Sequence, residues 1–421
     1  MKYGINTLDD FCVEGKTVLC RVDINSPIDR ETGALKDTTR IVRCLPTLKE
    51  LSERGAKTVL MAHQGGDLEY KNFASTENHA GVLSNLLARP VGFVDDVCGP
   101  AARNRIKELR NGEILLLDNV RFMSEEMTLF ETSLKLDPAA QSKTLVVRKL
   151  APLADLYVCD AFAAAHRSQP TLVGFQEVLP SAMGRLFEEE LTALSSVTEN
   201  PRRPCVFFLG GAKIQDAFIM MKTVLENGTA DTVLTGGLVA NIMLLAAGTR
   251  LGEPSENFIF MNSLSEYIEV SQSILDRYRE RVVLPSDLAF KTVDRSEVKV
   301  EDLPVERLLV DIGHRTVEAY RKIIAAAKTI FINGPAGVFE EAQSEYGTKS
   351  IWEATVQSGA YSVIGGGDSI AAMNKYSLAD KFSYVCTAGG GLVRFLSGEE
   401  LPVVKALRRS AEKFSLAKAG K

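Results

Sequence analysis

The sequence lacks the features that mark fibrous, disulfide-stapled or membrane-spanning proteins. Its 421 residues hold one tryptophan, no low-complexity tract, and no run of the roughly 18 uninterrupted apolar residues that cross a membrane. The opening residues, MKYGINTLDD, lack the apolar core of a secretory signal. With 45% hydrophobic and 24% charged residues, the chain is instead predicted to be a globular protein of the cytoplasm with two or three domains.

The cysteines are spaced too widely for a local redox pair or zinc site. No two of the seven lie closer than eight positions, which leaves no Cys-x-x-Cys pair and no zinc ribbon. Most stand in apolar runs such as 17–22 and 155–159, where a cysteine behaves as a small buried hydrophobe. Free thiols in a reducing compartment are therefore predicted.

The charge balance does not favour a polyanionic partner. The chain carries 49 lysines and arginines against 54 aspartates and glutamates, a formal charge of −5, so no overall positive field attracts nucleic acid or an anionic membrane. Any anion site must be local. We expect small-molecule substrates, no nucleic-acid or membrane partner, and a monomer or small homo-oligomer.

Short apolar, β-branched runs alternate with segments of helical periodicity, such as residues 40–54. This alternation predicts parallel sheets, and because the runs are continuously apolar, helices should cover both faces. Ten such runs are many for one open sheet. We therefore predict an α/β protein of two Rossmann-like, three-layer α/β/α domains. The runs expected as strands are 17–22, 57–62, 113–117, 155–159, 204–209, 231–235, 281–284, 328–332, 361–364 and 382–385.

The best domain boundary lies near Leu179 and Pro180, where a proline precedes a helical pattern expected over 181–194. That helix is predicted to join the two halves as a stiff connector. The polar stretches 122–143 and 286–306 are expected to be surface loops, and Ser124-Glu125-Glu126 a solvated turn.

In the first half, polar residues follow the expected strands. Since ligands of α/β sheets bind at the carboxyl ends of strands, these residues are expected at one edge. Guanidinium groups bind carboxylate or phosphate bidentately, so the set favours an anion pocket. Taken singly, each arginine is more often a surface ion-pair partner, and His63 a structural histidine. The residues are Arg21, Asp23, Asn25, His63, Asn119, Arg121, Asp160, His166 and Arg167.

In the second half the strand ends carry glycines instead. Glycine lets backbone amides approach a phosphate, and the following helix adds its positive end. One glycine-rich turn is weak evidence, but five at successive strand ends indicate a phosphate site. Lys213 offers a charge to phosphate and Asp368 a ligand to Mg²⁺, although each alone is equally a surface charge. The five turns are 210–211, 236–237, 333–335, 365–367 and 389–391.

Two common nucleotide motifs are absent. The chain has no G-x-x-x-x-G-K-[ST] and no spaced G-x-G-x-x-G with an acidic partner, which argues against a P-loop NTPase and an NAD-type Rossmann enzyme.

Taken in order, the motifs resemble those of the phosphoglycerate kinase family, most closely its archaeal branch, almost from end to end. They are 21–25 (RVDIN), 62–65 (AHQG), 118–122 (DNVRF), 160–162 (DAF) with 165–167 (AHR), 209–213 (LGGAK), 311–313 (DIG), 333–335 (NGP) with 337–340 (GVFE), and 365–368 (GGGD).

The resemblance implies a two-lobed enzyme whose parallel sheets face each other across a cleft. The lobe 1–180, to which 403–421 returns, would bind 3-phosphoglycerate, and the lobe 181–402 would bind Mg-ATP or Mg-ADP. The acceptor-binding residues implied are Asp23, Asn25, Arg40, His63, Arg121 and Arg167. The catalytic residues implied are Arg40, Lys213 and Gly390. The nucleotide-binding residues implied are Gly211, Lys213, Asn333, Glu340, Gly365, Gly366, Gly367 and Asp368, with Asp368 also associated with Mg²⁺.

Such a reaction needs no protein nucleophile, because the acceptor's carboxylate oxygen attacks the phosphorus itself. Catalysis is then alignment plus charge stabilisation, and lobe closure would exclude water. An arginine acting on the transferring group contributes about 10³–10⁵ in rate in related enzymes. Arg40 is the first residue we would mutate.

The sequence departs from the family in several places, including Ala217 in place of a lysine of other branches and Asp118 in place of glutamate. Two departures bear most on the proposed site. Gly66 and Asp67 stand where the family has arginine and proline, with Lys71 or Arg43 as possible replacements for the missing guanidinium. Ala388 stands where the family has glycine. Three interpretations remain open: an authentic phosphoglycerate kinase, which we favour, a paralogous kinase for another carboxylate acceptor, and a catalytically weak nucleotide-binding homologue.

Overall fold

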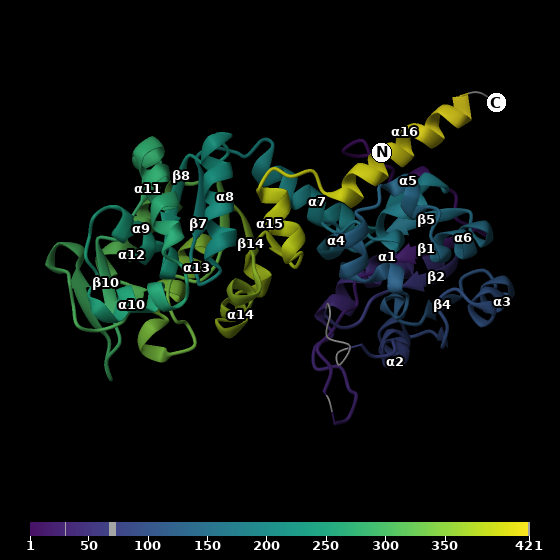
Figure 1. Cartoon of the computed structure of the whole chain (residues 1–421), viewed down its shortest axis with the longest axis horizontal. Helices are drawn as coiled ribbons and strands as arrows, with labels where there is room; N and C mark the ends of the chain where they lie inside the picture. Colours follow the sequence, from purple (N-terminus) through teal and green to yellow (C-terminus); the bar gives the residue numbers. More distant parts are fainter. Residues whose placement is uncertain (30, 67–72, 420–421) are drawn as a thin grey trace. The chain divides into compact units, whose positions relative to one another are not determined.

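The computed structural model of the chain describes residues 1–29, 31–66 and 73–419 and contains two compact α/β units (Figure 1). Unit 1 comprises Met1–Leu191 with Glu400–Lys421, and unit 2 comprises Thr192–Glu399. Within the described residues, no helix is both long and apolar enough to cross a membrane. All seven cysteines are free thiols, and only Cys12 is exposed.

Unit 1 is built on a six-stranded parallel sheet with the order β3-β4-β2-β1-β5-β6. The strands are β1 (Thr17–Arg21), β2 (Lys57–Met61), β3 (Val91–Val94), β4 (Ile114–Leu117), β5 (Leu156–Cys159) and β6 (Ser181–Met183). The helices are α1 (Thr39–Glu53), α2 (Glu77–Leu87), α3 (Pro100–Glu108), α4 (Thr128–Leu134), α5 (Pro138–Gln141), α6 (Leu145–Leu150), the start of α7 (Arg185–Thr198) and α16 (Pro402–Ala419).

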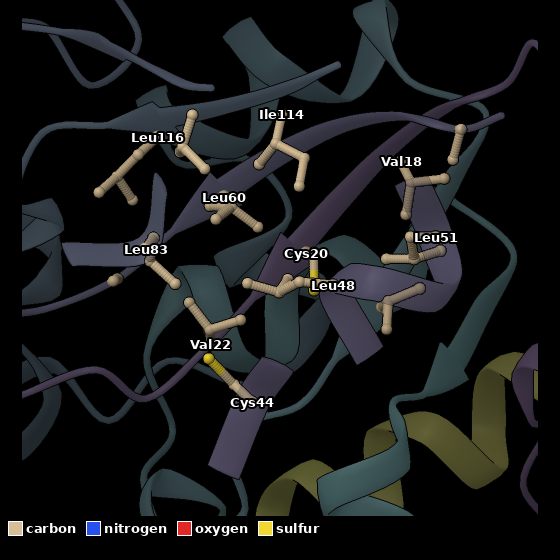
Figure 2. Close-up of a cluster of buried hydrophobic side chains, with 14 of the residues drawn as sticks. Val18, Cys20, Val22, Cys44, Leu48, Leu51, Leu60, Leu83, Ile114 and Leu116 are labelled. Carbon is tan, nitrogen blue, oxygen red and sulfur yellow. The ribbon is translucent and has the colours of Figure 1, made fainter. Parts of the chain in front are cut away.

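The core of unit 1 forms where α1 packs on the sheet (Figure 2). Cys44, Leu48 and Leu51 recur at helical spacing along α1 and are buried against the strand residues Val18 and Leu60. Burial of each large apolar side chain stabilises the fold by about 1.5–3 kcal/mol. This packing fixes the first turn of α1 at the carboxyl edge of the sheet.

Unit 2 holds a second six-stranded parallel sheet, of order β15-β14-β13-β7-β8-β9, and a small antiparallel sheet, β11-β10-β12. The strands are β7 (Cys205–Leu209), β8 (Thr232–Thr235), β9 (Val282–Val283), β10 (Asp287–Phe290), β11 (Ser296–Lys299), β12 (Leu309–Ile312), β13 (Thr329–Asn333), β14 (Tyr361–Gly365) and β15 (Tyr384–Cys386). The helices are α8 (Ile214–Glu226), α9 (Gly237–Ala246), α10 (Glu253–Met261), α11 (Glu266–Tyr278), α12 (His314–Ala326), α13 (Tyr346–Gln357), α14 (Gly367–Lys375) and α15 (Gly390–Leu396).

The structure confirms the α/β class, the two parallel sheets and a strand within each of the ten expected runs. Three expectations were wrong. The connecting helix begins at Arg185 because Ser181–Met183 pairs with β5 as an edge strand. The stretch 286–306 contains β10 and β11, which pair with each other, and 122–143 contains α4 and α5. The common cleft between the two sheets stays a prediction.

Candidate active site

The loop after β1 and the first turn of α1 meet in unit 1 through an ion pair. Arg40, the second residue of α1, donates from Nη1 to Oδ2 of Asp23 at 2.5 Å, and Asp23 is almost fully buried. Asp37 accepts hydrogen bonds from the backbone amide and hydroxyl of Thr39 and so fixes the start of the helix. The guanidinium of Arg40 keeps 39% exposure and lines a cavity of about 820 Å³. It is therefore both tethered and accessible.

Asn25 joins the same edge to the turn after β2. Its side-chain oxygen accepts from the amide of Gly65 at 3.1 Å, and the carbonyl of Gly65 accepts from Nη1 of Arg121. Arg121 lies in a short helical turn after β4 and is buried. These contacts bring the residues expected after three different strands to one place.

His63 lies beside Arg21, with 3.1 Å between Nδ1 of the ring and Nη2 of the guanidinium, and the charges of three further arginines act on it. Burial is the main cause that holds its pKa well below the usual value near 6.5, and the charges of Arg21, Arg121, Arg40 and Arg167 act in the same direction. The imidazole is therefore neutral at physiological pH. The surrounding positive charge is suited to an acceptor that carries several negative charges.

All four of these arginines have protein partners, and Arg21 and Arg167 differ in how exposed they remain. Arg21 is 1% exposed and donates to His63, Thr171 and the carbonyl of Val22, so its guanidinium is committed inside the protein. Arg167 donates to the hydroxyl of Thr128 at 2.7 Å and remains partly exposed. Only the second is positioned to meet a ligand from solvent.

Gly66 lines the same cavity as Arg40. A Cβ atom built there would meet none of the described residues within 4 Å, and the backbone is not in the left-handed region, so the described part of the fold does not require glycine. Arg43 lies 3.9 Å from both Glu189 and Glu190 of α7, among carboxylates. The other two residues of this departure, Asp67 and Lys71, lie outside the described residues.

In unit 2 the glycine turns pack backbone against backbone. A Cβ on Gly334 would lie 2.0 Å from the carbonyl oxygen of Gly210, and one on Gly366 would lie 2.4 Å from Oδ1 of Asn333. Both glycines also have positive φ angles. Only glycine allows these loops to approach so closely, and they line a small hollow together with Gly211 and Lys213. The amides of Gly211 and Gly334 are already bonded, to the Pro335 carbonyl and the Ser369 hydroxyl.

Charged groups flank this hollow. Nζ of Lys213 lies 3.5 Å from Oδ2 of Asp368, and both side chains are more than half exposed. Asp368 stands in the first turn of α14, directly after Gly366 and Gly367. Together they place a cation, a carboxylate and a helix N-terminus side by side, which is suited to phosphate groups with a bound cation.

An apolar cavity of about 250 Å³ continues from these loops. Gly211, Asp368 and Glu340 line it together with apolar side chains, including Phe258 and Leu309. The last two were not among the expected site residues, because strand and helix residues of this kind carry no signal in the sequence. Glycine turns with a nearby cation, next to an apolar cavity, favour a nucleotide.

Two expected residues are placed by backbone position alone: Gly365 ends β14 and Gly390 begins α15. Ala388 is unstrained, since the positive φ falls on Gly389. Sequence reasoning also misjudged Glu126, expected in a solvated turn. It is fully buried and accepts two hydrogen bonds from Thr171.

Unit 1 therefore holds a candidate anion site, and unit 2 a candidate phosphate and nucleotide site, each at the carboxyl edge of a parallel sheet. This combination is typical of phosphotransferases built from two α/β units. The profile of the family described as "Phosphoglycerate kinase" matches residues 8–399. The chain belongs to this family, as the sequence motifs indicated.

Individual relatives agree. The phosphoglycerate kinase of Methanothermobacter thermautotrophicus is 46% identical over 97% of this chain and 98% of its own length. The phosphoglycerate kinase of Thermococcus kodakarensis is 43% identical over 97% of this chain and 98% of its own length. The crystal structure of phosphoglycerate kinase from Pyrococcus horikoshii OT3 has a TM-score of 0.86 and 40% identity, and the match covers 97% of this chain and all of that one.

Proposed function

We propose that the protein transfers a phosphoryl group between Mg-ATP or Mg-ADP and the carboxylate of 3-phosphoglycerate or 1,3-bisphosphoglycerate, a step of glycolysis and gluconeogenesis. The observation that carries the proposal is the set of four guanidinium groups whose charges act on the neutral His63, with an accessible Arg40 among them. A compact polyanion is the ligand that such a site binds best.

The acceptor binds in unit 1. Arg121 and Arg167 supply charge-assisted hydrogen bonds to its phosphate, and His63 supplies a neutral one. Asp23 and Asn25 hold Arg40 and the turn at Gly65 in place, as their contacts indicate. Arg40 then stabilises the charge that spreads over the transferring group.

The nucleotide binds in unit 2. The amides of Gly366 and Gly367 and the side chain of Asn333 contact its phosphates, and the turn at Gly211 lines the same hollow. Lys213 neutralises the phosphate charge, and Glu340 accepts from the ribose hydroxyls. The backbone at Gly365 and Gly390 belongs to the same proposed phosphate cradle. The cavity beside Phe258 takes the base.

The donor set fits Mg²⁺ held mainly by substrate. Among the described residues there is no group of three or more His, Cys, Asp or Glu side chains that would cage an ion. Mg²⁺ keeps several waters and typically takes one or two carboxylates plus substrate phosphates, so the single carboxylate of Asp368 suffices. The ion would neutralise phosphate charge during transfer.

The chain's own residues supply no covalent intermediate. They hold the carboxylate oxygen in line with the γ-phosphorus and offer fixed positive charge where negative charge develops. We place the reaction in the cytoplasm, because six buried free cysteines suit a reducing compartment.

A coupled assay of the purified protein tests the proposal. Mg-ATP is supplied with 3-phosphoglycerate, 2-phosphoglycerate, glycerate and other hydroxy acids, and kcat/KM is compared. We expect 3-phosphoglycerate to exceed every other acceptor by at least about 100-fold, since loss of the phosphate leaves desolvated guanidinium groups unpaired. If another acceptor in the panel is used better, the protein is a paralogous kinase for that acceptor. If no acceptor is turned over, the protein is a catalytically weak nucleotide-binding homologue.

A further inference from the structure

A continuous chain of buried hydrogen bonds runs behind the anion site of unit 1. Thr171, in the helical turn Pro170–Gly174, donates its amide and its hydroxyl to the two carboxylate oxygens of Glu126 at 2.6 and 2.8 Å. The same hydroxyl accepts from Nε of Arg21 at 3.1 Å. Nη2 of Arg21 lies 3.1 Å from Nδ1 of His63. Glu126, Thr171 and Arg21 are each at most 1% exposed.

The chemistry of the donors orients every bond in this chain. A guanidinium has only donors, so Nδ1 of His63 must accept, and a neutral imidazole then carries its proton on Nε2. The hydroxyl of Thr171 accepts a hydrogen bond from Arg21 and donates one to Glu126. Reversal of the bond from Arg21 would set two donors against each other, and an ionised Glu126 has no proton to donate to Thr171.

The positive charges near His63 also favour its neutral form. Arg21 from the end of β1, Arg40 from α1, Arg121 from the turn after β4 and Arg167 from the loop after β5 all oppose protonation of the ring. The carboxylates at this edge have other partners, because Asp23 pairs with Arg40 and Glu126 stands behind Thr171.

We propose that Glu126, Thr171 and Arg21 are positioning residues that fix His63 as a neutral Nε2–H donor for an anionic oxygen of the acceptor. Arg21 then orients His63 and does not bind the anion. The role of His63 as a hydrogen-bond donor to the acceptor rests on the proposed function, whereas the tautomer of His63 does not.

Nitrogen NMR of the protein labelled with ¹⁵N-histidine tests the tautomer directly. The chain has only four histidines, and a His63→Gln sample assigns the signal of His63. We expect the Nε2–H tautomer without titration between pH 6 and pH 8. An Nδ1–H tautomer or an imidazolium at pH 7 in the wild type would overturn the proposal, whatever the variants do.

The pair Thr171→Val and Thr171→Ser separates positioning from packing. Valine keeps the shape and removes the hydroxyl, whereas serine keeps the hydroxyl. We expect Thr171→Val to raise the KM for 3-phosphoglycerate about fivefold at unchanged nucleotide KM, and to bring His63 into titration above pH 5, because Arg21 loses its Nε partner. Thr171→Ser should restore both.

Two results contradict this inference: a Thr171→Val spectrum identical to that of the wild type, or equal effects of the two variants. A protein that shows the expected tautomer but no activity towards 3-phosphoglycerate would refute the proposed function and leave the positioning of His63 intact.

Discussion

Asp160 gives a stability prediction whose size can be worked from the structure. The residue follows β5, is fully buried and accepts from the amide of Phe187 in the first turn of α7. Burial raises its pKa from 3.8 to about 7, against the opposing hydrogen bonds of Thr47 and of the Phe187 and Leu186 amides. Between these two pH values the folded state binds a proton that the unfolded state has lost.

The sign follows from this difference in bound protons. As the pH rises from 4 to 7, the free energy of unfolding falls, because ionisation of the buried carboxyl is penalised only in the folded state. About three pKa units at about 1.4 kcal/mol each amount to about 4 kcal/mol. Asp160→Asn cannot titrate, so its stability relative to the wild type should rise by about 4 kcal/mol from pH 4 to pH 8, on top of a pH-independent offset.

Buried thiols and the single tryptophan provide the assay. Cys20, Cys44 and Cys159 are buried in unit 1, and Trp352 is buried in unit 2. Thiol labelling in urea, resolved by mass spectrometry, follows the opening of unit 1, and Trp352 emission is the internal control. A stability difference that stays constant from pH 4 to pH 8 would refute the reasoning about Asp160.

Three further substitutions address the proposed reaction. Arg40→Ala should lower kcat about 10³-fold or more at unchanged nucleotide affinity, measured by coupled assay and calorimetry, and an unchanged kcat would remove Arg40 from the mechanism. Gly66→Arg should fold with an unchanged Tm, since its Cβ meets none of the described residues within 4 Å, and should lower the KM for 3-phosphoglycerate; an unaltered KM would show that a guanidinium there adds nothing. Asp368→Ala should raise the Mg²⁺ concentration needed for half-maximal rate, and the same Mg²⁺ dependence as the wild type would exclude the carboxylate from ion binding.

The parallel topology explains why so much of the candidate site could be predicted from sequence. Parallel strands end at a common edge, so polar residues directly after β1, β2 and β4 had to meet once those strands were recognised. The contacts of Asn25 with Gly65 and of Gly65 with Arg121 follow from this rule. Five short strands were missed: β3, β6, β10, β11 and β12. Each has three or four residues, and β3 and β12 are interrupted by Gly92 and Asp311, so their apolar runs are too short to separate them from loops.

Long-range burial could not be predicted in the same way. The Ser-Glu-Glu triplet around Glu126 has the composition of a solvated turn, and only its contact with Thr171, 45 residues further along the chain, makes it a buried acceptor. Arg21 is the reverse case. Its position at the end of β1 predicts an anion ligand, yet its three protein partners turn it inward.

The arginines of unit 1 divide into fixed and movable charges, and the division matches the chemistry proposed for them. Arg21 and Arg121 are buried and fully oriented, so they add a permanent field that needs no reorganisation when an anion arrives. Arg40 is accessible and is held through its ion pair with Asp23. A side chain that follows the phosphoryl group from nucleotide to acceptor must be able to move. A side chain that binds the acceptor is different, because ordering a mobile side chain lowers the binding affinity. If both kinds were equally rigid, Arg40→Ala and a substitution at Arg121 would change kcat and KM in the same proportion. We expect the first to act on kcat and the second on KM.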